Sequence, residues 1–401
     1  MINSKYTIYD ITERGLFCDG DWIEKKDQDK NGNIRLIQLA DIGDGYFIDK
    51  SNKYINEDTA KRLNCTFLKK GDILISRLGS PLGKACIFPL DGKCITAVDV
   101  AIVRIVDPSI NRKYVMHLIN SLEFRSKIVS YQTGTTRKRI SRKNLAKITF
   151  ELPPLPEQER IVAKIEELFS DLDDAVETLN VTKKQLEVYK QTVLYEAFSD
   201  LTDTVDMQEV ATMIDPQPSH RTPIEVVGGI PYIGIGDIDY DSNVIKFDSA
   251  RKVSKSVLTE HLNRYTLSKG DFVMGKIGTI GKPYRIPMPQ KYALSANVIL
   301  IQPNRELIFP DFLYWQFSSY HVTSQLLKGA NATSQPAFGI KKSRLLKIKM
   351  CDYEQQMEIT SDIESKISVY ESIANTVEKS LEEALAMRQS ILKQAFEGRL
   401  L

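Results

Sequence analysis

The side chains best suited to chemistry in this chain are basic residues gathered in one short segment. Gly134-Thr135-Thr136-Arg137-Lys138-Arg139-Ile140-Ser141-Arg142-Lys143 has five basic residues among its last seven. A guanidinium can donate two parallel hydrogen bonds to guanine or to a phosphate. The segment therefore predicts DNA contacts through Thr135, Thr136, Arg137, Lys138, Arg139 and Arg142. The alternative is a solvated loop that caps a helix at Ser141.

A second set of candidates lies at matching places later in the chain. Asn331-Ala332-Thr333-Ser334-Gln335-Pro336, with Lys341 and Lys342, is less basic and richer in amides, which suits contacts with adenine or through water. Thr333, Ser334, Gln335, Lys341 and Lys342 are the predicted contacts there. Arg77 and Lys276, each after a strand that opens with Gly-Asp, are further candidates, with Gln38 as a weaker one. For Gln38, Asp41, Gly234 and Asp237 a purely structural role is the alternative.

The sequence shows no motif for a catalytic centre. Asp215-Pro216-Gln217-Pro218 fails the pattern of an adenine methyltransferase, and Gly79-Ser80-Pro81-Leu82-Gly83-Lys84-Ala85 is one residue short of a phosphate-binding loop. Residues 79–85 and the matching Gly278-Thr279-Ile280-Gly281-Lys282-Pro283 are interpreted as two tight loops, in which glycine lets the backbone approach a partner such as a DNA phosphate. The alternative is that each is a simple turn between strands. Four histidines (117, 220, 261 and 321) lack metal-site spacing. His117, on an apolar helix, is expected to be packed.

Composition is that of a globular protein, and the charge is unevenly divided. Hydrophobic residues make up 42% of the 401 positions, and no stretch is long and apolar enough to span a bilayer. Five cysteines without a C-x-x-C pair favour a reducing cytoplasm. Residues 157–200 carry a net charge of −6 and residues 353–401 a net charge of −4. Because the whole chain has a net charge of +2, the remaining residues carry +12. A basic remainder suits binding to phosphates or is merely solvated.

The chain is a tandem duplication of a unit about half its length. Residues 34–42 recur at 230–238, Lys70-Gly71-Asp72 at Lys269-Gly270-Asp271, and 144–148 at 344–348, with offsets of 196, 199 and 200. Glu157-Gln158 matches Glu354-Gln355 at 197, and Gln191-x-x-Leu194-x-x-Ala197-Phe198 matches Gln389-x-x-Leu392-x-x-Ala395-Phe396 at 198. Ordered matches of this kind predict a pseudo-dimer with an internal two-fold axis.

Each copy is predicted to hold a globular α+β part followed by a long helix. The globular parts mix β-branched runs with short helical patterns at 114–121 and 312–319. From Glu157 to Asp215 there is neither Gly nor Pro, and apolar residues recur in steps of three and four from Val162 to Val193, as they do from Ile363 to Ile391. Two helices of about 40–45 residues, roughly 60–67 Å each, are expected to pair antiparallel. The alternative is that each packs only on its own domain.

The sequence resembles the specificity subunits of type I restriction-modification systems. Pro153-Pro154-Leu155-Pro156-Glu157-Gln158-Glu159-Arg160 before a heptad helix is similar to their central region, and Gln394-Ala395-Phe396-Glu397-Gly398-Arg399-Leu400 to their C-terminus. The second helix start, Cys351-Asp352-Tyr353-Glu354-Gln355-Gln356, departs from the motif. The resemblance implies an α+β protein with two tandem-duplicated target-recognition domains (1–152 and 204–350). Two long antiparallel coiled-coil helices (153–203 and 351–401) separate them.

Family membership further implies a non-catalytic subunit that binds a bipartite, asymmetric double-stranded DNA target. Two methyltransferase subunits would dock on the helices and carry S-adenosylmethionine, so no cofactor is expected in this chain; the presence of restriction subunits stays open. A coiled-coil adaptor that binds only proteins would show the same helices without the basic remainder or the basic segment. A self-contained modification enzyme would need a cofactor motif that the sequence lacks.

Overall fold

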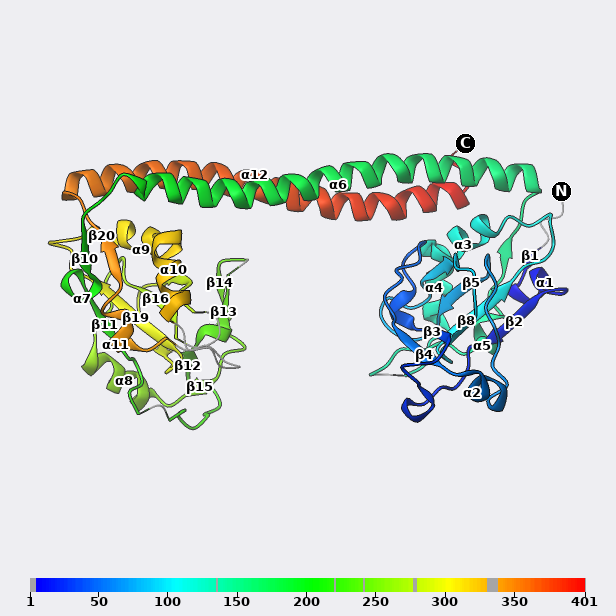
Figure 1. The fold of residues 1–401 in the computed structure, drawn as a ribbon, viewed down its shortest axis with the longest axis horizontal. Helices are drawn as coiled ribbons and strands as arrows, with labels where there is room; N and C mark the ends of the chain where they lie inside the picture. Colours follow the sequence, from blue (N-terminus) through cyan, green and yellow to red (C-terminus); the bar gives the residue numbers. More distant parts are fainter. Residues whose placement is uncertain are drawn as a thin grey trace. The chain divides into compact units, whose positions relative to one another are not determined.

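The computed structural model describes residues 5–134, 136–219, 221–240, 242–276, 280–329 and 338–400. The chain divides into two compact units: unit 1 comprises residues 1–179 and 379–401, and unit 2 comprises residues 180–378. Each unit takes its globular part from one half of the sequence. Each also includes a segment of both long helices, α6 (Leu155–Ser199) and α12 (Tyr353–Phe396) (Figure 1).

Unit 1 is built on two small sheets. One is antiparallel with strand order β2-β8-β5-β6; the other has order β4-β3-β7, with β3 parallel to β7, and β1 pairs with β9. The strands are β1 (Lys5–Tyr6), β2 (Leu16–Asp19), β3 (Ile34–Ile37), β4 (Lys53–Ile55), β5 (Ile73–Ser76), β6 (Ala85–Ile87), β7 (Cys94–Thr96), β8 (Val100–Arg104) and β9 (Phe150–Glu151). The helices are α1 (Ile8–Ile11), η1 (Lys25–Asp27), η2 (Leu39–Asp41), α2 (Glu57–Arg62), α3 (Arg112–Asn120), α4 (Leu122–Ser130) and α5 (Arg142–Leu145).

The central strand β5 explains how the layers of unit 1 are held. Ile73 and Ile75 belong to a core shared with α3 and α4, whereas Leu74 packs in a separate core with Ile37 of the second sheet. Successive side chains of a strand point to opposite faces, so a continuous apolar run is buried on both sides. The antiparallel sheet is therefore sandwiched between the helices and the second sheet.

Unit 2 repeats this architecture and adds one further pair of strands, β13-β14. Its sheets have the orders β11-β19-β16-β17 and β15-β12-β18, with pairs β10-β20 and β13-β14. The strands are β10 (Thr204–Asp206), β11 (Ala211–Ile214), β12 (Ile230–Ile233), β13 (Ile238–Asp239), β14 (Val244–Ile245), β15 (Lys252–Val253), β16 (Phe272–Gly275), β17 (Pro283–Arg285), β18 (Ala293–Leu294), β19 (Val298–Pro303) and β20 (Lys347–Lys349). The helices are α7 (Met207–Val210), η3 (Ile235–Asp237), α8 (Lys255–Arg264), α9 (Pro310–Ser318), α10 (Tyr320–Gly329) and α11 (Ile340–Ser343). The duplicated α+β fold is confirmed.

The two long helices pair antiparallel, as predicted. In unit 1, Ile165 of early α6 shares a core with Ile391 of late α12, and the Arg388 guanidinium lies 4.1 Å from the Phe169 ring centroid. In unit 2 the order is reversed, because Leu194 of late α6 shares a core with Ile363 of early α12. Each helix therefore packs on its partner helix as well as on its own domain. No helix among the described residues is long and apolar enough to cross a membrane.

The helix starts show that one match between the copies was placed wrongly. Gln158, buried at the start of α6, accepts a hydrogen bond from the Asn111 backbone N–H (2.8 Å) and donates to the Pro153 carbonyl (2.7 Å). Gln356 makes the same contacts with Phe309 N–H (2.7 Å) and the Cys351 carbonyl (2.9 Å). Gln158 thus corresponds to Gln356 and not to Gln355, so the two helix starts are equivalent despite the missing prolines.

Candidate nucleic-acid interface

Several of the predicted contact residues of unit 1 meet at one edge of its sheets, which we call the loop edge of unit 1. β2, β3, β5 and β7 all end there. The Ala97 N–H donates to the Ile37 carbonyl (3.1 Å), the Arg77 N–H to the Asp99 carbonyl (2.8 Å), and the Ile140 N–H to the Arg77 carbonyl (3.0 Å). These bonds bring Gln38, Arg77 and residues 136–142 together from three distant parts of the sequence.

The described residues of the basic segment form a short hairpin closed by Thr133 and Arg139, and we call residues 133, 134 and 136–139 the basic hairpin. Thr133 and Arg139 exchange backbone hydrogen bonds of 2.8 and 2.9 Å, and the Gly79 N–H donates to the Lys138 carbonyl (3.2 Å). Gly134 has φ +87°, and a Cβ there would lie 2.4 Å from the Arg137 carbonyl oxygen, so the tip requires glycine. The Ser141 hydroxyl accepts from the Asn144 N–H (3.1 Å), which confirms the helix cap beside the hairpin.

The cations of the basic hairpin and the neighbouring Arg142 differ in whether they form ion pairs within the unit. Thr136, Arg137 and Lys138 are exposed, and Arg137 and Lys138 form no ion pair with any described residue. Arg139 pairs with the Asp99 carboxylate (2.7 Å). Arg142 donates to the Phe17 carbonyl (3.2 Å) and lies 3.9 Å from the Asp19 carboxylate. Arg137 and Lys138 are therefore the cations best placed to meet a phosphate or a base; Thr135 lies outside the described residues.

Arg77 and Lys276 are held in the interior of their units. The Arg77 side chain is 5% exposed, donates to the Val98 carbonyl (2.5 Å) and pairs with the Asp19 carboxylate (3.1 Å). Lys276 forms the corresponding ion pair with Asp215 (2.9 Å) at 15% exposure. Removing either cation would take an ion pair away from a carboxylate that is 35% (Asp19) or 16% (Asp215) exposed. The two residues are equivalent, as expected, and each side chain forms an ion pair within its own unit.

Gln38 lies at the loop edge, next to a structural carboxylate. Its backbone N–H donates to Asp41 (2.7 Å), which is fully buried and also accepts from the Lys50 and Ser51 N–H groups (2.7 and 2.6 Å). Asp237 accepts in the same way from the Gly234 N–H (2.8 Å). The structural alternative therefore holds for the two aspartates. The half-buried Gln38 side chain stays a candidate contact.

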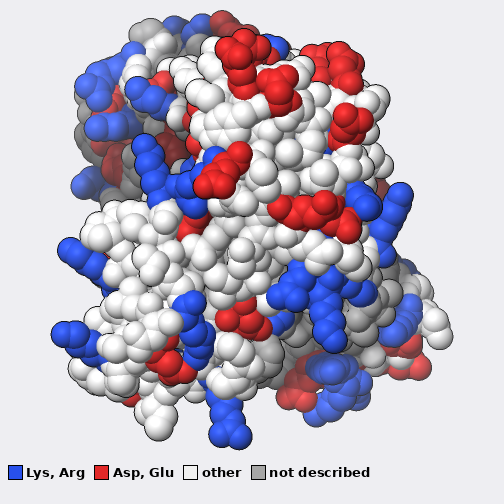
Figure 2. Space-filling model, turned by 90° about the vertical axis from the view of Figure 1, so that its left-hand side faces the viewer, with Lys and Arg blue, Asp and Glu red and all other residues white. Residues whose placement is uncertain are grey.

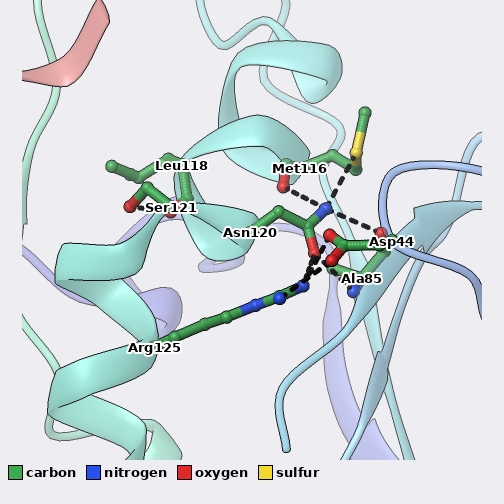
Figure 3. A network of polar contacts seen from close by, with 7 residues as sticks. All are labelled: Asp44, Ala85, Met116, Leu118, Asn120, Ser121 and Arg125. Carbon is green, nitrogen blue, oxygen red and sulfur yellow. Dashed lines mark hydrogen bonds and ion pairs between the residues drawn. The ribbon is translucent and has the colours of Figure 1, made fainter. Parts of the chain in front are cut away.

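The loop that follows Gln38 is fixed by a polar network (Figure 3). The Asp44 carboxylate accepts two hydrogen bonds from the Arg125 guanidinium (2.9 and 2.6 Å). Asn120, 1% exposed, accepts from Arg125 (2.7 Å) and from the Ala85 N–H (3.0 Å) and donates to the Ala85 carbonyl (2.8 Å). Since charge-assisted, bidentate bonds are strong and directional, the loop around Asp44 is pinned to α4 and to the start of β6.

The two glycine loops approach the chain's own helices. A Cβ at Gly83 (φ +82°) would lie 2.4 Å from Ile128 Cδ1 in α4, and one at Gly281 (φ +74°) would lie 2.2 Å from Leu326 Cδ1 in α10. For these glycines the close partner is a helix side chain, which corrects the expectation of a DNA phosphate. The neighbouring Gly79 is exposed, with open space around its Cβ position.

Unit 2 has an equivalent loop edge, where β11, β12, β16 and β18 end. The Ser295 N–H donates to the Ile233 carbonyl (2.8 Å), the Lys276 N–H to the Asn297 carbonyl (2.8 Å), and the Phe338 N–H to the Lys276 carbonyl (2.9 Å). Lys341 is exposed, whereas Lys342 donates to the Gly329 carbonyl (2.7 Å). Thr333, Ser334 and Gln335 lie outside the described residues. Figure 2, a view onto unit 2, shows Lys and Arg side chains interleaved with acidic ones. Whether a given cation can bind DNA therefore depends on whether it already forms an ion pair with a neighbouring carboxylate.

Three residues at the loop edges were not among the sequence candidates. Trp22 is 66% exposed and directly follows Asp21, whose N–H donates to the Thr96 carbonyl (2.7 Å). In unit 2, the Lys282 ammonium lies 4.3 Å from the Tyr240 ring centroid. Lys282 could have been found from its place in the duplicated glycine loop, but nothing in the sequence indicated that Trp22 is exposed or that Tyr240 lies beside Lys282.

Two of the four histidines lie in the interior of their units. His117 is 5% exposed and lies edge-on to the Phe169 ring at 5.6 Å, which confirms the expected packing; burial lowers its pKa to about 4. His261 is fully buried, bonds to Gln217 (2.9 Å) and Tyr265 (3.0 Å), and its pKa is also lowered by burial to about 4. The described residues contain no cluster of His, Cys, Asp and Glu that could hold a metal ion.

The chain belongs to the family of type I restriction modification DNA specificity domains, whose sequence pattern matches residues 4–188 and again residues 203–383. It is 22% identical to the type I restriction enzyme EcoBI specificity subunit of Escherichia coli, over 74% of this chain and 68% of that protein. It is also 22% identical to the EcoKI specificity subunit of Escherichia coli strain K12, over 92% and 83%.

A solved structure supports the fold. It is described as the structural basis underlying complex assembly and conformational transition of the type I R-M system. One of its chains superposes on this one with a TM-score of 0.74, covering 99% of this chain and 98% of that chain at 16% identity. The double match of the family pattern to the two halves agrees with the duplication seen in the strands.

Proposed function

We propose that this chain supplies the DNA specificity of a type I restriction-modification complex in the cytoplasm, each loop edge binding one half of a bipartite target. The observation that carries this is the duplicated loop edge, which in unit 1 presents Arg137 and Lys138 without carboxylate partners on an exposed, glycine-tipped hairpin. Such a pair of donors can bind phosphates and base edges. The two edges differ in their side chains, which suits a target with two unlike half-sites.

The long helices support the second part of the proposal, the docking of two methyltransferase subunits. Val181, Val188 and Tyr195 recur at seven-residue intervals on α6 and are 47%, 66% and 62% exposed. An exposed apolar stripe on a helix favours contact with another protein. The docked subunits would hold S-adenosylmethionine and transfer its methyl group to adenine, whereas this chain would provide neither cofactor nor catalytic residue. Restriction subunits would join the same complex where the system includes them.

Reconstitution with its methyltransferase subunits tests the proposal. Transfer of labelled methyl groups to DNA is expected from the assembled complex, and neither the chain alone nor the methyltransferase alone should methylate a defined site. Methyl transfer by the isolated chain would contradict the proposal. Normal site-specific methylation without the chain would contradict it as well, and would favour a protein adaptor.

A further inference from the structure

The loop edge of unit 2 carries a hairpin that is longer than its counterpart in unit 1. Asp41 and Ile48 bracket the loop in unit 1, where the Ile48 N–H donates to the Asp41 carbonyl (2.9 Å) and a single bridge joins Ile42 to Phe47. In unit 2, the Lys246 N–H donates to the Asp237 carbonyl (2.8 Å). The loop from Asp237 to Lys246 is two residues longer and forms the two-stranded β13-β14 hairpin. The insertion accounts for the change in offset between the copies from 196 at Asp41 and Asp237 to 198 at Ile48 and Lys246.

Two tyrosines clamp this hairpin to β17. The Tyr284 hydroxyl donates to the Asn243 carbonyl (3.0 Å), and the Tyr284 ring lies edge-on to the Tyr240 ring at 5.9 Å. The Tyr240 hydroxyl donates to the Lys282 carbonyl (3.1 Å), while the Lys282 ammonium lies over the Tyr240 ring at 4.3 Å. Tyr240 therefore holds Lys282 at both its backbone and its charged end. In unit 1 the corresponding loop is held differently, by Asp44 and Arg125 (Figure 3).

Lys282 is also a cation with no carboxylate partner among the described residues. Two neighbouring lysines at this edge have partners: Lys246 pairs with Asp239 (3.1 Å) and Lys276 with Asp215 (2.9 Å). Lys282 is exposed and forms no ion pair with any described residue. The same distinction singles out Arg137 and Lys138 in unit 1. A cation stacked on an aromatic ring keeps its outward hydrogen-bond donors, so Lys282 can still bind an acceptor.

We propose that Lys282, held against Tyr240, is a specificity-determining residue that donates hydrogen bonds to a guanine in the half-site bound by unit 2. The inference rests on the proposed function. A two-stranded ribbon fits the major groove, where guanine presents two acceptors, O6 and N7, to a lysine or an arginine. Because the ring and the backbone bond already restrict Lys282, less side-chain entropy is lost when it binds a defined base edge.

The test maps methylated adenines in DNA modified by the complete complex carrying Lys282→Ala. The expected result is that one base position in one half-site becomes degenerate, with a preference for guanine reduced about tenfold or more, while the other half-site keeps its sequence. Tyr240→Leu, which removes the ring, should relax the same position, and Tyr240→Phe, which keeps the ring, should relax it less. Lys246→Ala is the matched control, because Lys246 is an exposed lysine at the end of the hairpin that carries Tyr240 and has a carboxylate partner; this variant should leave the motif unchanged.

Three outcomes would overturn the inference. One is an unchanged motif with Lys282→Ala; another is relaxation of the same position by Lys246→Ala. The third is methylation that falls uniformly at an intact motif, together with a weaker salt dependence of DNA binding, which would make Lys282 a phosphate contact. The unmodified complex is measured in parallel. If it produces no bipartite motif, the proposed function itself has failed, and this result is distinct from all three.

Discussion

Replacing both unpaired cations of the basic hairpin, with Arg137→Ala and Lys138→Ala in one variant, should weaken DNA binding and flatten its salt dependence. Each phosphate contact contributes about 0.9 to the slope of log K against log salt concentration. Losing two contacts should therefore reduce that slope by about 1.8. Between about 50 and about 200 mM salt, the affinity gap between unmodified and variant protein should narrow by about twelvefold.

Arg139 is left in place because it pairs with Asp99 and its backbone closes the hairpin. The structure thus separates residues that bind from residues that shape the loop, which a triple alanine variant would not do.

The assay is equilibrium binding of the complete complex to a duplex carrying its target, over a salt series. Lys61→Ala with Lys69→Ala is the matched control, because both lysines are exposed and lie in the last turn of α2 and ahead of the first residue of β5, outside the residues assigned to the loop edge. The control should keep the original slope. An unchanged slope in the Arg137 and Lys138 variant, with thermal unfolding also unchanged, would refute the assignment of the basic hairpin to the interface.

Three further predictions concern the elements that hold the edges. Burial lowers the pKa of His117 to about 4, against about 6.5 in an unfolded chain, so between these pH values the unfolded chain binds a proton that the folded chain does not. The free energy of unfolding therefore falls as the pH falls from about 6.5 toward about 4. His117→Phe should reduce the drop in unfolding free energy between pH 7 and 5 by about 2 kcal/mol, and an equal drop in both proteins would contradict this. Gly83→Ala should destabilise the chain by about 1–3 kcal/mol because of its φ and of Ile128, whereas Gly236→Ala, with open space around it, should cost under about 0.5 kcal/mol in denaturant unfolding. Inserting four residues near Thr182 in α6 and four near Glu378 in α12 should lengthen the spacer of the target by one or two base pairs, since a helical turn adds roughly 6 Å; methylation at the original spacing would show that the helices do not set it.

The matched insertion follows from the structure and could not have been designed from the sequence. Unit 1 and unit 2 each contain segments of both helices, and the Lys183 ammonium pairs with Glu378 (2.8 Å) near the point where the units divide. An insertion in α6 alone would shift its pairing with α12. The heptad pattern predicted the helices and their antiparallel pairing, because an apolar stripe is visible in sequence.

The helix starts show where pattern matching reached its limit. The match of Glu157-Gln158 to Glu354-Gln355 was one residue out of register, because the second copy has two adjacent glutamines and only hydrogen bonding identifies Gln356 as the equivalent of Gln158. A sequence match cannot distinguish the buried amide of Gln356, which holds a loop by hydrogen bonds, from the exposed amide of Gln355 beside it.

The candidate interface was predicted in part. The basic hairpin was predicted from its cluster of positive charge, because packing in a core does not require several arginines in one exposed loop. Arg77 was chosen for its place after a strand that opens with Gly-Asp. Its partner Asp19 lies 58 positions earlier in the chain, and sequence does not show an ion pair across such a separation. Lys282 was overlooked for the converse reason: its partner Tyr240 comes from a hairpin whose two extra residues have no counterpart in the first copy.

The most direct test of the account is a map of methylated adenines in host DNA with and without this chain. The account predicts a motif with two unlike half-sites at a fixed spacing, present with the chain and lost when it is deleted while the methyltransferase remains. A motif that persists unchanged after deletion would contradict the claim that this chain determines where the complex acts on DNA.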